Sequence, residues 1–324
     1  MTSITAVRPG EVSPPRRSLG APRREGRAGR VVVVAGFAGL AGSLVVVFAL
    51  RAHEAIAHYG PGFLFGRVWS PATGVLGALP FIVGTLETTL IAMVVAVPVG
   101  LGCALFLVCF VSGRLRAFIS SAIELLAGIP SVVYGLWALQ VAAPWVRTVV
   151  EPAVHAVLGP FGIASGPELG VGLLLAGLVL SVMVLPTMVS VTRDVIAAVP
   201  DSQIESALAL GASRWQAITR VALPAARAGV LGATTLAMGR ALGETIAVAM
   251  VIGDTPRVPH SLFAPADTMT SVLANEFTEA TERFHSAALF EIALLLLGVS
   301  VFVNLIARLL ARSIRRRNVW TDLA

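Results

Sequence analysis

The chain of 324 residues contains no lysine, because all 24 of its basic residues are arginine. A phosphate-binding P-loop needs a lysine that reaches the β- and γ-phosphates of a nucleotide. The chain therefore cannot hydrolyse ATP through such a loop, and catalysis through a lysine Schiff base is excluded as well. We expect a chain that is not itself an enzyme and that holds no cofactor.

Charged residues and cysteines are also scarce. Only 13% of the residues are charged, whereas 56% are hydrophobic. A soluble domain needs a charged surface, so this balance indicates a protein with several membrane spans. The two cysteines, Cys103 and Cys109, fall on one predicted helix about 9 Å apart along its axis, which is beyond disulfide reach. We interpret both as packing residues.

Long apolar stretches predict the fold. A membrane-spanning helix needs about 20 mostly apolar residues, and six stretches meet or approach that length. We therefore predict an all-α integral membrane protein with six transmembrane helices. The second and third stretches are longer than a single crossing needs, so tilt, kinks or re-entrant portions are expected. The stretches are residues 31–50, 78–110, 117–146, 169–192, 228–253 and 286–311.

The arginine distribution predicts the orientation. With both termini in the cytoplasm, 18 arginines lie on the cytoplasmic side and five outside, and Arg240 falls inside a span. The positive-inside rule favours this topology. Residues 1–30 are rich in Pro, Gly, Ser and Arg, which predicts a disordered cytoplasmic tail that could touch anionic lipid. All five histidines fall in the outer loops and are interpreted as exposed surface residues.

Residues 205–224 form a polar interruption with a distinctive pattern. Two capping-box patterns, S-x-x-E from Ser202 and S-x-x-Q from Ser213, each predict the start of a helix. Gly211 is placed to end the first helix, and Pro224 is placed to stop the second. We therefore expect two short helices joined by a sharp turn. This segment is either a docking surface for a partner or an amphipathic helix on the membrane surface.

Two charged residues stand inside the fifth stretch. Arg240 and Glu244 are four residues apart in GRALGET, so a continuous helix would place them on one face, beside a GxxxG pair made by Gly239 and Gly243. One interpretation is that they only neutralise each other at a helix interface. The other is that Arg240 faces a path for an oxyanion, which guanidinium binds well, and that Glu244 holds Arg240 in place.

A second candidate region surrounds a proline in the third stretch. Pro130 in GIPSVVYGLW, residues 128–137, should break the helix, and exposed backbone at membrane depth is tolerated only beside protein or a polar cavity. Ser131 and Tyr134 could line or brace such a cavity, and Glu124 lies just before the break. A kinked packing helix remains the alternative. Glu87, in the second stretch, is either interfacial or functional.

Four segments together resemble the PstC-type permeases of bacterial phosphate-specific ABC importers. The resemblance implies a type I importer fold, in which the chain pairs with a PstA-type sister permease. It also implies two copies of a cytoplasmic PstB-type ATPase and an external phosphate-binding protein as partners. Arg240 and Glu244 are implied as the charged residues linked to phosphate passage. The segments are residues 128–137, 205–224, 239–254 and 261–277.

The resemblance implies that residues 205–224 are the EAA loop that couples the permease to the ATPase. We expect Glu205, Ala207, Gly211, Arg214, Leu223 and Pro224 to form the coupling surface, and Arg240, Glu244, Glu124, Ser131 and Tyr134 to line the substrate pathway.

The resulting prediction is a permease subunit of an ATP-driven phosphate importer in a bacterial plasma membrane. Its neighbours would be lipid and protein, with no nucleic acid. The alternatives are a permease for phosphonate, sulfate or molybdate, a gradient-driven transporter, and a membrane subunit that does not transport. The expected division is a tail at 1–30, a first span and outer loop at 31–74, a permease domain at 75–312 and a cytoplasmic tail at 313–324.

Overall fold

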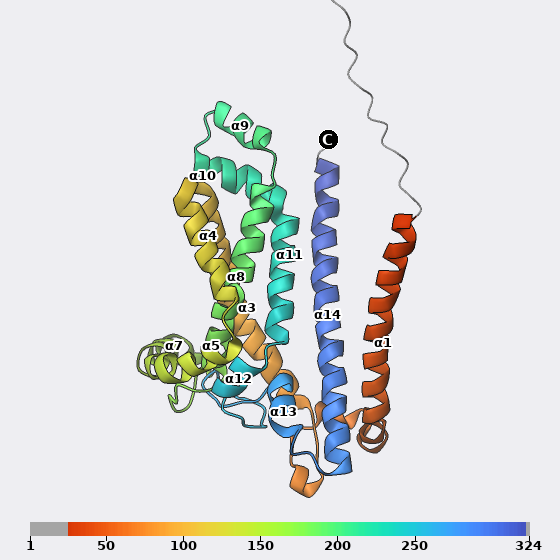
Figure 1. Ribbon diagram of the computed structural model, residues 1–324. Coiled ribbons are helices and arrows are strands. Elements are labelled where there is room, and N and C mark those ends of the chain that lie inside the picture. The colour runs from red at the N-terminus through yellow and green to blue at the C-terminus, as the bar shows by residue number, and fades with distance from the viewer. Residues whose placement is uncertain (1–24, 322–324) are drawn as a thin grey trace, which may run out of the picture. The chain divides into compact units, whose positions relative to one another are not determined.

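A computed structural model describes the backbone of residues 25–321 and the side chains of residues 32–309. Every named element within residues 25–321 is a helix (Figure 1). The chain divides into two compact units, residues 1–47 and 48–324. Helix α1 (Glu25–Tyr59) begins inside the predicted N-terminal tail, and the rest of that tail, residues 1–24, lies outside the described residues.

Long apolar helices confirm the predicted membrane architecture. Five helices within residues 25–321 are long and apolar enough to cross a membrane, and a sixth crossing results if one bent helix pair counts as one span. That pair corresponds to the third predicted stretch. The five helical spans are Val32–Tyr59 in α1, Leu79–Cys109 (α3), Leu173–Ala197 (α8), Arg214–Leu242, and Arg283–Leu309 in α14 (Arg283–Thr321).

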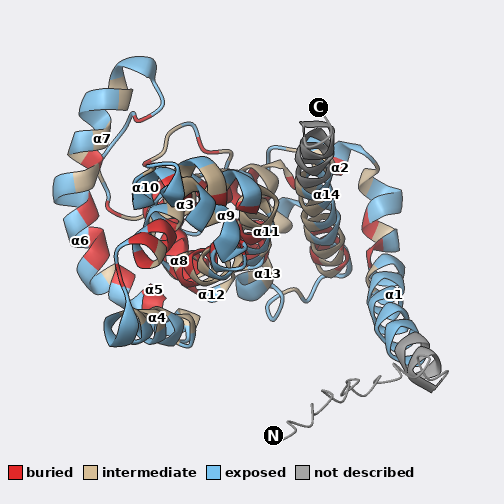
Figure 2. Cartoon of the chain, turned by 90° about the horizontal axis from the view of Figure 1, so that it is seen from above, coloured by how far each residue is buried: buried red, intermediate tan, exposed pale blue. Residues whose placement is uncertain are grey.

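Helices α3 and α8 form the centre of the second unit, and α8 is buried along much of its length (Figure 2). Small residues allow the two helices to approach closely. A Cβ on Gly100 of α3 would lie 2.6 Å from Cγ of Met188, and a Cβ on Gly177 of α8 would lie 2.5 Å from Cγ2 of Ile91. Close helix packing of this kind provides most of the attraction between helices in lipid.

The third predicted stretch is bent rather than straight. Helix α4 (Gly113–Ala127) and the helical segment Ser131–Phe161 meet at 91° across the break that contains Pro130. The predicted break is therefore confirmed, although the second arm is much longer than expected. That arm consists of α5 (Ser131–Trp137), α6 (Ala143–Trp145) and α7 (Glu151–Leu158), joined by π-helical turns at Ala138–Ala142 and Val146–Val150 and closed by a 3-10 turn at Gly159–Phe161.

Each π-helical turn of the described chain ends two residues before a proline: Pro144, Pro152 or Pro224. A proline has no backbone N–H and its ring clashes with the carbonyl four residues earlier in an α-helix. Widening the preceding turn to i→i+5 spacing moves that carbonyl away. The prolines therefore lie inside continuous helices without stopping them.

The fifth predicted stretch, residues 228–253, is divided in two. One helix runs from α10 (Arg214–Ala217) through the π-helical turn Ile218–Ala222 into α11 (Leu223–Leu242), and α12 (Ile246–Val251) follows after a break. The remaining helices of the second unit are α2 (Gly62–Phe65), a 3-10 turn at Pro71–Thr73, α9 (Asp201–Ala209) and α13 (Met269–Glu276).

Candidate functional site: a helical elbow and a broken span

The elbow of residues 201–224 turns at Gly211, as predicted. The Gly211 N–H donates to the carbonyl of Leu208 at 3.0 Å, and the Ala212 N–H donates to the carbonyl of Ala207 at 3.1 Å. These two bonds make a Schellman motif, which needs a left-handed residue at its turn. Gly211 has φ +87°. The carbonyl of Ala207 therefore acts as one of the two acceptors that end α9.

The second predicted capping box is confirmed. The Gln216 N–H donates to Ser213 Oγ at 3.3 Å, and the Ser213 N–H donates to Gln216 Oε1 at 2.9 Å. These bonds satisfy donors that would otherwise be unpaired at the start of α10. The sequence pattern thus fixes the direction in which the chain leaves the Gly211 turn.

Two other expectations for the elbow are wrong. Helix α9 begins at Asp201 and its N-cap is Pro200, with φ −57° and ψ 131°, so Ser202 lies within the first turn and cannot cap it. Pro224 does not stop the second helix, because the π-helical turn before it lets the chain continue to Leu242. The second arm of the elbow is therefore the beginning of a long span, not a short separate helix.

Apolar side chains hold the elbow against the ends of the spans. Ile218 and Ala222 are buried with Leu105 and Cys109 of α3 and Ile196 of α8. Glu205, Arg214 and Pro224 are exposed, whereas Ala207 and Leu223 are half-buried. The predicted coupling residues therefore divide into exposed groups that a partner could contact and half-buried groups that anchor the loop.

The break in the fifth span corrects the relation predicted for Arg240 and Glu244. Helix α11 ends at Leu242 and Gly243 is its C-cap, so Glu244 lies in the connection before α12 and not on the helix face of Arg240. Among the described side chains, no ion pair joins Arg240 to a carboxylate. Arg240 is exposed and Glu244 is half-buried. The GxxxG pair is likewise split, because Gly239 is helical and Gly243 is not.

Residues from α3 and α13 support this break. Thr270 Oγ1 donates to the carbonyl of Glu244 at 2.8 Å, and the Met269 N–H donates to Thr85 Oγ1 at 2.9 Å. A Cβ on Gly84 would lie 2.0 Å from the carbonyl oxygen of Asp267, so only glycine fits at this contact. The Glu244 backbone is therefore fixed through α13 to the first turns of α3.

Asp267 is a buried carboxyl group that the sequence interpretation missed. Its residue is only 2% exposed, and it accepts bonds from the Thr268 N–H at 2.8 Å and from the Ser271 hydroxyl. Burial raises the pKa of Asp267 to about 7, although both hydrogen bonds oppose that shift. In the sequence, the T-x-x-S capping box that begins α13 could have pointed to Asp267, because it follows Asp267 directly.

Tyr134 braces the bend of the third span. Its hydroxyl donates to the carbonyl of Leu126 at 2.9 Å, and its residue is 8% exposed. Tyr134 belongs to the same buried cluster as Ala237 and Ala241 of α11, the helix that carries Arg240. Ser131 is half-buried in the first turn of α5. A Cβ on Gly135 would lie 2.6 Å from the sulfur of Met250, so α5 packs closely on α12.

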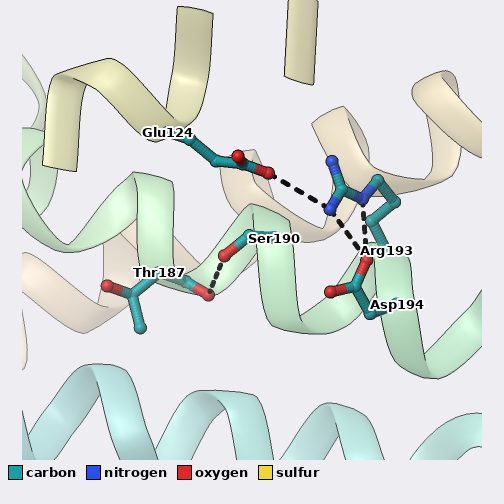
Figure 3. Close-up of polar contacts among 5 residues, drawn as sticks. All are labelled: Glu124, Thr187, Ser190, Arg193 and Asp194. Atoms are coloured by element: carbon teal, nitrogen blue, oxygen red, sulfur yellow. Dashed lines mark hydrogen bonds and ion pairs between the residues drawn. The ribbon is translucent and has the colours of Figure 1, made fainter. Parts of the chain in front are cut away.

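Glu124 takes part in a charged cluster between α4 and α8 (Figure 3). Arg193 Nη2 lies 3.4 Å from Glu124 Oε1 and 2.8 Å from Asp194 Oδ1. The side chains of Glu124 and Asp194 are 58% and 65% exposed, whereas that of Arg193 is 17% exposed. Arg193 belongs to α8, which extends to Ala197 and so runs beyond the end of the predicted stretch 169–192.

Other buried acidic groups were also missed. Both carboxylate oxygens of Glu151 accept from the Gly170 N–H, at 3.2 and 3.1 Å. Glu291 is 8% exposed inside a predicted span, and a carboxyl group at such a position was a sufficient sequence signal to single it out.

His285 is buried and bonded to Glu276 at 2.7 Å, so the interpretation of all histidines as exposed is wrong for this residue. Glu87 is half-buried.

The described residues contain no group of three or more His, Cys, Asp or Glu side chains that could hold a metal ion. Within the same part of the chain, Cys103 and Cys109 are both free, as predicted.

Comparison with known proteins identifies the family. The profile described as "Binding-protein-dependent transport system inner membrane component" matches residues 96–316. A protein of Mesorhizobium japonicum named "Phosphate transport system permease protein PstC" is 41% identical over 282 residues, which is 86% of each chain. A protein of the same name from Xylella fastidiosa is 42% identical over 82% of each chain. "Phosphate transport system permease protein PstC 1" of Mycobacterium tuberculosis is 37% identical over 80% of this chain and 79% of its own.

A solved structure supports the fold. A chain of the inward-facing MetNI methionine ABC transporter has a TM-score of 0.52 at 17% identity, and the match covers 71% of this chain and 93% of that one. The likeness confirms the ABC importer permease fold predicted from the sequence. The chain is therefore a multi-pass membrane permease of the binding-protein-dependent transport system inner membrane component family, and within that family it belongs to the PstC-type permeases.

Proposed function

We propose that the chain forms half of the membrane pathway of an ATP-driven importer of inorganic phosphate. The observation that carries the proposal is the break at residues 243–245, which ends α11 next to Arg240 and leaves that side chain exposed. A guanidinium without a carboxylate partner among the described side chains is available to a tetrahedral oxyanion. The names of the similar permeases support phosphate as that anion.

Glu244 contributes selectivity in this proposal. Its carboxylate can accept a hydrogen bond from a protonated phosphate oxygen, whereas fully ionised sulfate has no proton to donate. Its negative charge also prevents tight anion binding, and a transport pathway must release what it binds. Tyr134 and Ser131 line or brace the pathway at the bend, and Glu124 contributes a further polar group toward α8. These five residues constitute the proposed pathway.

The elbow is proposed as the docking surface for an ATPase. The support is its shape: two helices held at a fixed angle by the Gly211 turn, with Glu205 and Arg214 exposed on it. Ala207, Leu223 and Pro224 keep that angle, through the Schellman bond and the start of α11. Since the chain has no lysine for a P-loop, the energy for transport would come from two copies of a separate PstB-type ATPase.

The remaining partners follow from the same proposal. A PstA-type permease completes the pathway, and an external phosphate-binding protein delivers the anion. The site is a bacterial plasma membrane, with both chain termini in the cytoplasm. The excess of arginines on the elbow side of the spans supports this orientation.

Uptake of labelled phosphate by the complete complex in sealed vesicles tests the function. We expect uptake that requires ATP, that arsenate inhibits because of its equal charge and shape, and that equimolar sulfate leaves unchanged. Equal inhibition by sulfate would instead favour a broader oxyanion permease. Uptake without ATP, driven by an ion gradient, would contradict the importer proposal.

A further inference from the structure

A cavity of about 410 Å³ lies between the elbow and the ends of the spans. It is bounded by the last turn of α3, the first turns of α4, the end of α8, and helices α9 and α10 (Figure 1). Its apolar wall includes Val108 and Cys109 from α3, together with Ile204 and Ile218 from the elbow. Because α3 and α8 are apolar spans that end here, the cavity lies at the boundary between hydrocarbon and water.

Four charged side chains line the same cavity: Arg116, Arg214, Asp201 and Glu205. None of the four forms an ion pair with another described side chain. Arg116 from α4 and Arg214 from α10 line the cavity together with Cys109 at the end of α3. The site therefore offers two cationic donors and two anionic acceptors, and its net charge is zero.

This charge pattern is selective among lipid headgroups. An anionic headgroup would satisfy the arginines but would be repelled by the two carboxylates. A choline headgroup carries a cation that has no N–H to donate. An ethanolamine headgroup has a phosphodiester for the guanidinium groups and an ammonium with three donors for the carboxylates. Its glycerol and acyl portions would continue along the apolar wall.

We propose that this cavity binds the headgroup of phosphatidylethanolamine, with the phosphodiester on Arg116 and Arg214 and the ammonium on Asp201 and Glu205. The proposal does not depend on which anion the permease transports. The bound lipid connects α9 and α10 to the ends of α3 and α4, and so fixes the elbow relative to the membrane surface.

Lipid retention by the purified full-length chain tests the proposal. The chain is equilibrated in mixed micelles with equal amounts of phosphatidylethanolamine, phosphatidylcholine and phosphatidylglycerol, and bound lipids are counted by native mass spectrometry. We expect phosphatidylethanolamine to be retained in preference to the other two. Arg116→Gln should weaken its binding about tenfold, as expected for the loss of a charge-assisted hydrogen bond. The matched control is Arg114→Gln, which lies outside the cavity lining and should retain the wild-type pattern.

A second variant separates the ammonium from the phosphodiester. Asp201→Asn should lower retention of phosphatidylethanolamine and leave that of phosphatidylglycerol unchanged or higher, since one repelling carboxylate is gone. Asp201 is exposed, and an unchanged thermal transition of the variant shows that the chain still folds. Equal retention by wild type, Arg116→Gln and Asp201→Asn would overturn the proposal, as would a wild-type preference for phosphatidylglycerol.

Two further measurements distinguish a lipid from a soluble phosphoester, and a lipid site from an ATPase contact. Soluble phosphoethanolamine should displace the lipid only at more than about a hundredfold excess, because it lacks the acyl contacts. Displacement at equal concentration would assign the site to a soluble phosphoester and would contradict a lipid site. Glu205 and Arg214 also belong to the proposed docking surface, so addition of the ATPase should lower retention only in part, because Arg116 and Asp201 still hold the headgroup. If the ATPase expels the lipid, and Arg116→Gln weakens ATPase binding without changing lipid retention, the cavity belongs to that interface and the proposal is wrong.

Discussion

The hydroxyl of Tyr134 donates a 2.9 Å hydrogen bond to the backbone carbonyl of Leu126, across the bend that separates α4 from α5. The bond joins the two arms of the third span at the point where Pro130 interrupts the helix. Residue 130 would be the α-helical partner of that carbonyl but is a proline without an N–H, so the hydroxyl adds to the Ile129 N–H, which donates to the same carbonyl at 3.3 Å. The angle between the arms is therefore supported by one side chain.

Tyr134→Phe should lower the stability of the chain by about 1 kcal/mol and reduce phosphate uptake, because the carbonyl of Leu126 keeps only backbone donors from its own turn and the bend loosens. Tyr59→Phe is a matched control, since it removes a 2.7 Å bond from a tyrosine to the carbonyl of Gly74 away from the bend. Thermal unfolding and vesicle uptake measure the two effects. Equal loss of uptake in both variants would contradict a specific role for the bend.

Gly211→Val should leave the membrane spans folded and weaken ATPase attachment about tenfold. A left-handed residue with a side chain costs about 1–2 kcal/mol, and Gly211 has φ +87°. No atom lies within 4 Å of a Cβ at this position, so the effect is confined to the backbone of the turn. Gly211→Asn is the control, because asparagine tolerates this conformation better. Unchanged ATPase pull-down by the valine variant would show that the docking role is misplaced.

Asp267 should make stability fall as pH rises. Its pKa is about 7 in the folded chain, against an ordinary value of 3.8 for an aspartate, so between these values the folded state binds a proton that the unfolded state has lost. Stability is then greatest below about pH 4 for this group, declines up to about pH 7 and is level above it. Asp267→Asn should remove this part of the pH dependence in thermal unfolding, and the exposed control Glu279→Gln should retain it. An unchanged slope in Asp267→Asn would contradict the assignment.

The pair of Arg193 and Glu124 should contribute little to stability. Glu124 is 58% exposed, and exposed ion pairs contribute about 0.2–1 kcal/mol. A double-mutant cycle with Arg193→Gln and Glu124→Gln measures the coupling between them. A coupling energy well above 1 kcal/mol would contradict this expectation, because it would show that the pair between α4 and α8 is shielded from solvent.

Apolar stretches and single turn residues predicted much of this architecture. The lengths of the apolar stretches indicated the spans, because a helix that crosses lipid has a minimum length. Pro130 predicted the bend, Gly211 the elbow turn, and Ser213 with Gln216 a helix start. These signals are local, since each depends on backbone geometry within one turn of the helix.

Features that depend on neighbouring helices were not predictable in the same way. Pro224 continues a helix because a π-helical turn precedes it, whereas a proline taken by itself predicts a helix stop. The break after Leu242 is held by Thr270, whose hydroxyl donates to the Glu244 carbonyl and which lies more than twenty residues further along the chain. The assumption of a continuous helix therefore placed Glu244 on the wrong face. Arg240 itself was identified correctly as a charge inside a span.

ATP-driven uptake of labelled phosphate by complexes that carry Arg240→Ala is the most direct test of the proposed pathway. The complex must first be shown to assemble and to hydrolyse ATP at its normal basal rate. Uptake should then be abolished, because the anion loses the cation that compensates for its loss of water, and Arg240→Lys should restore part of it. Normal uptake by Arg240→Ala in an assembled complex would contradict the assignment of the pathway to this break in the fifth span.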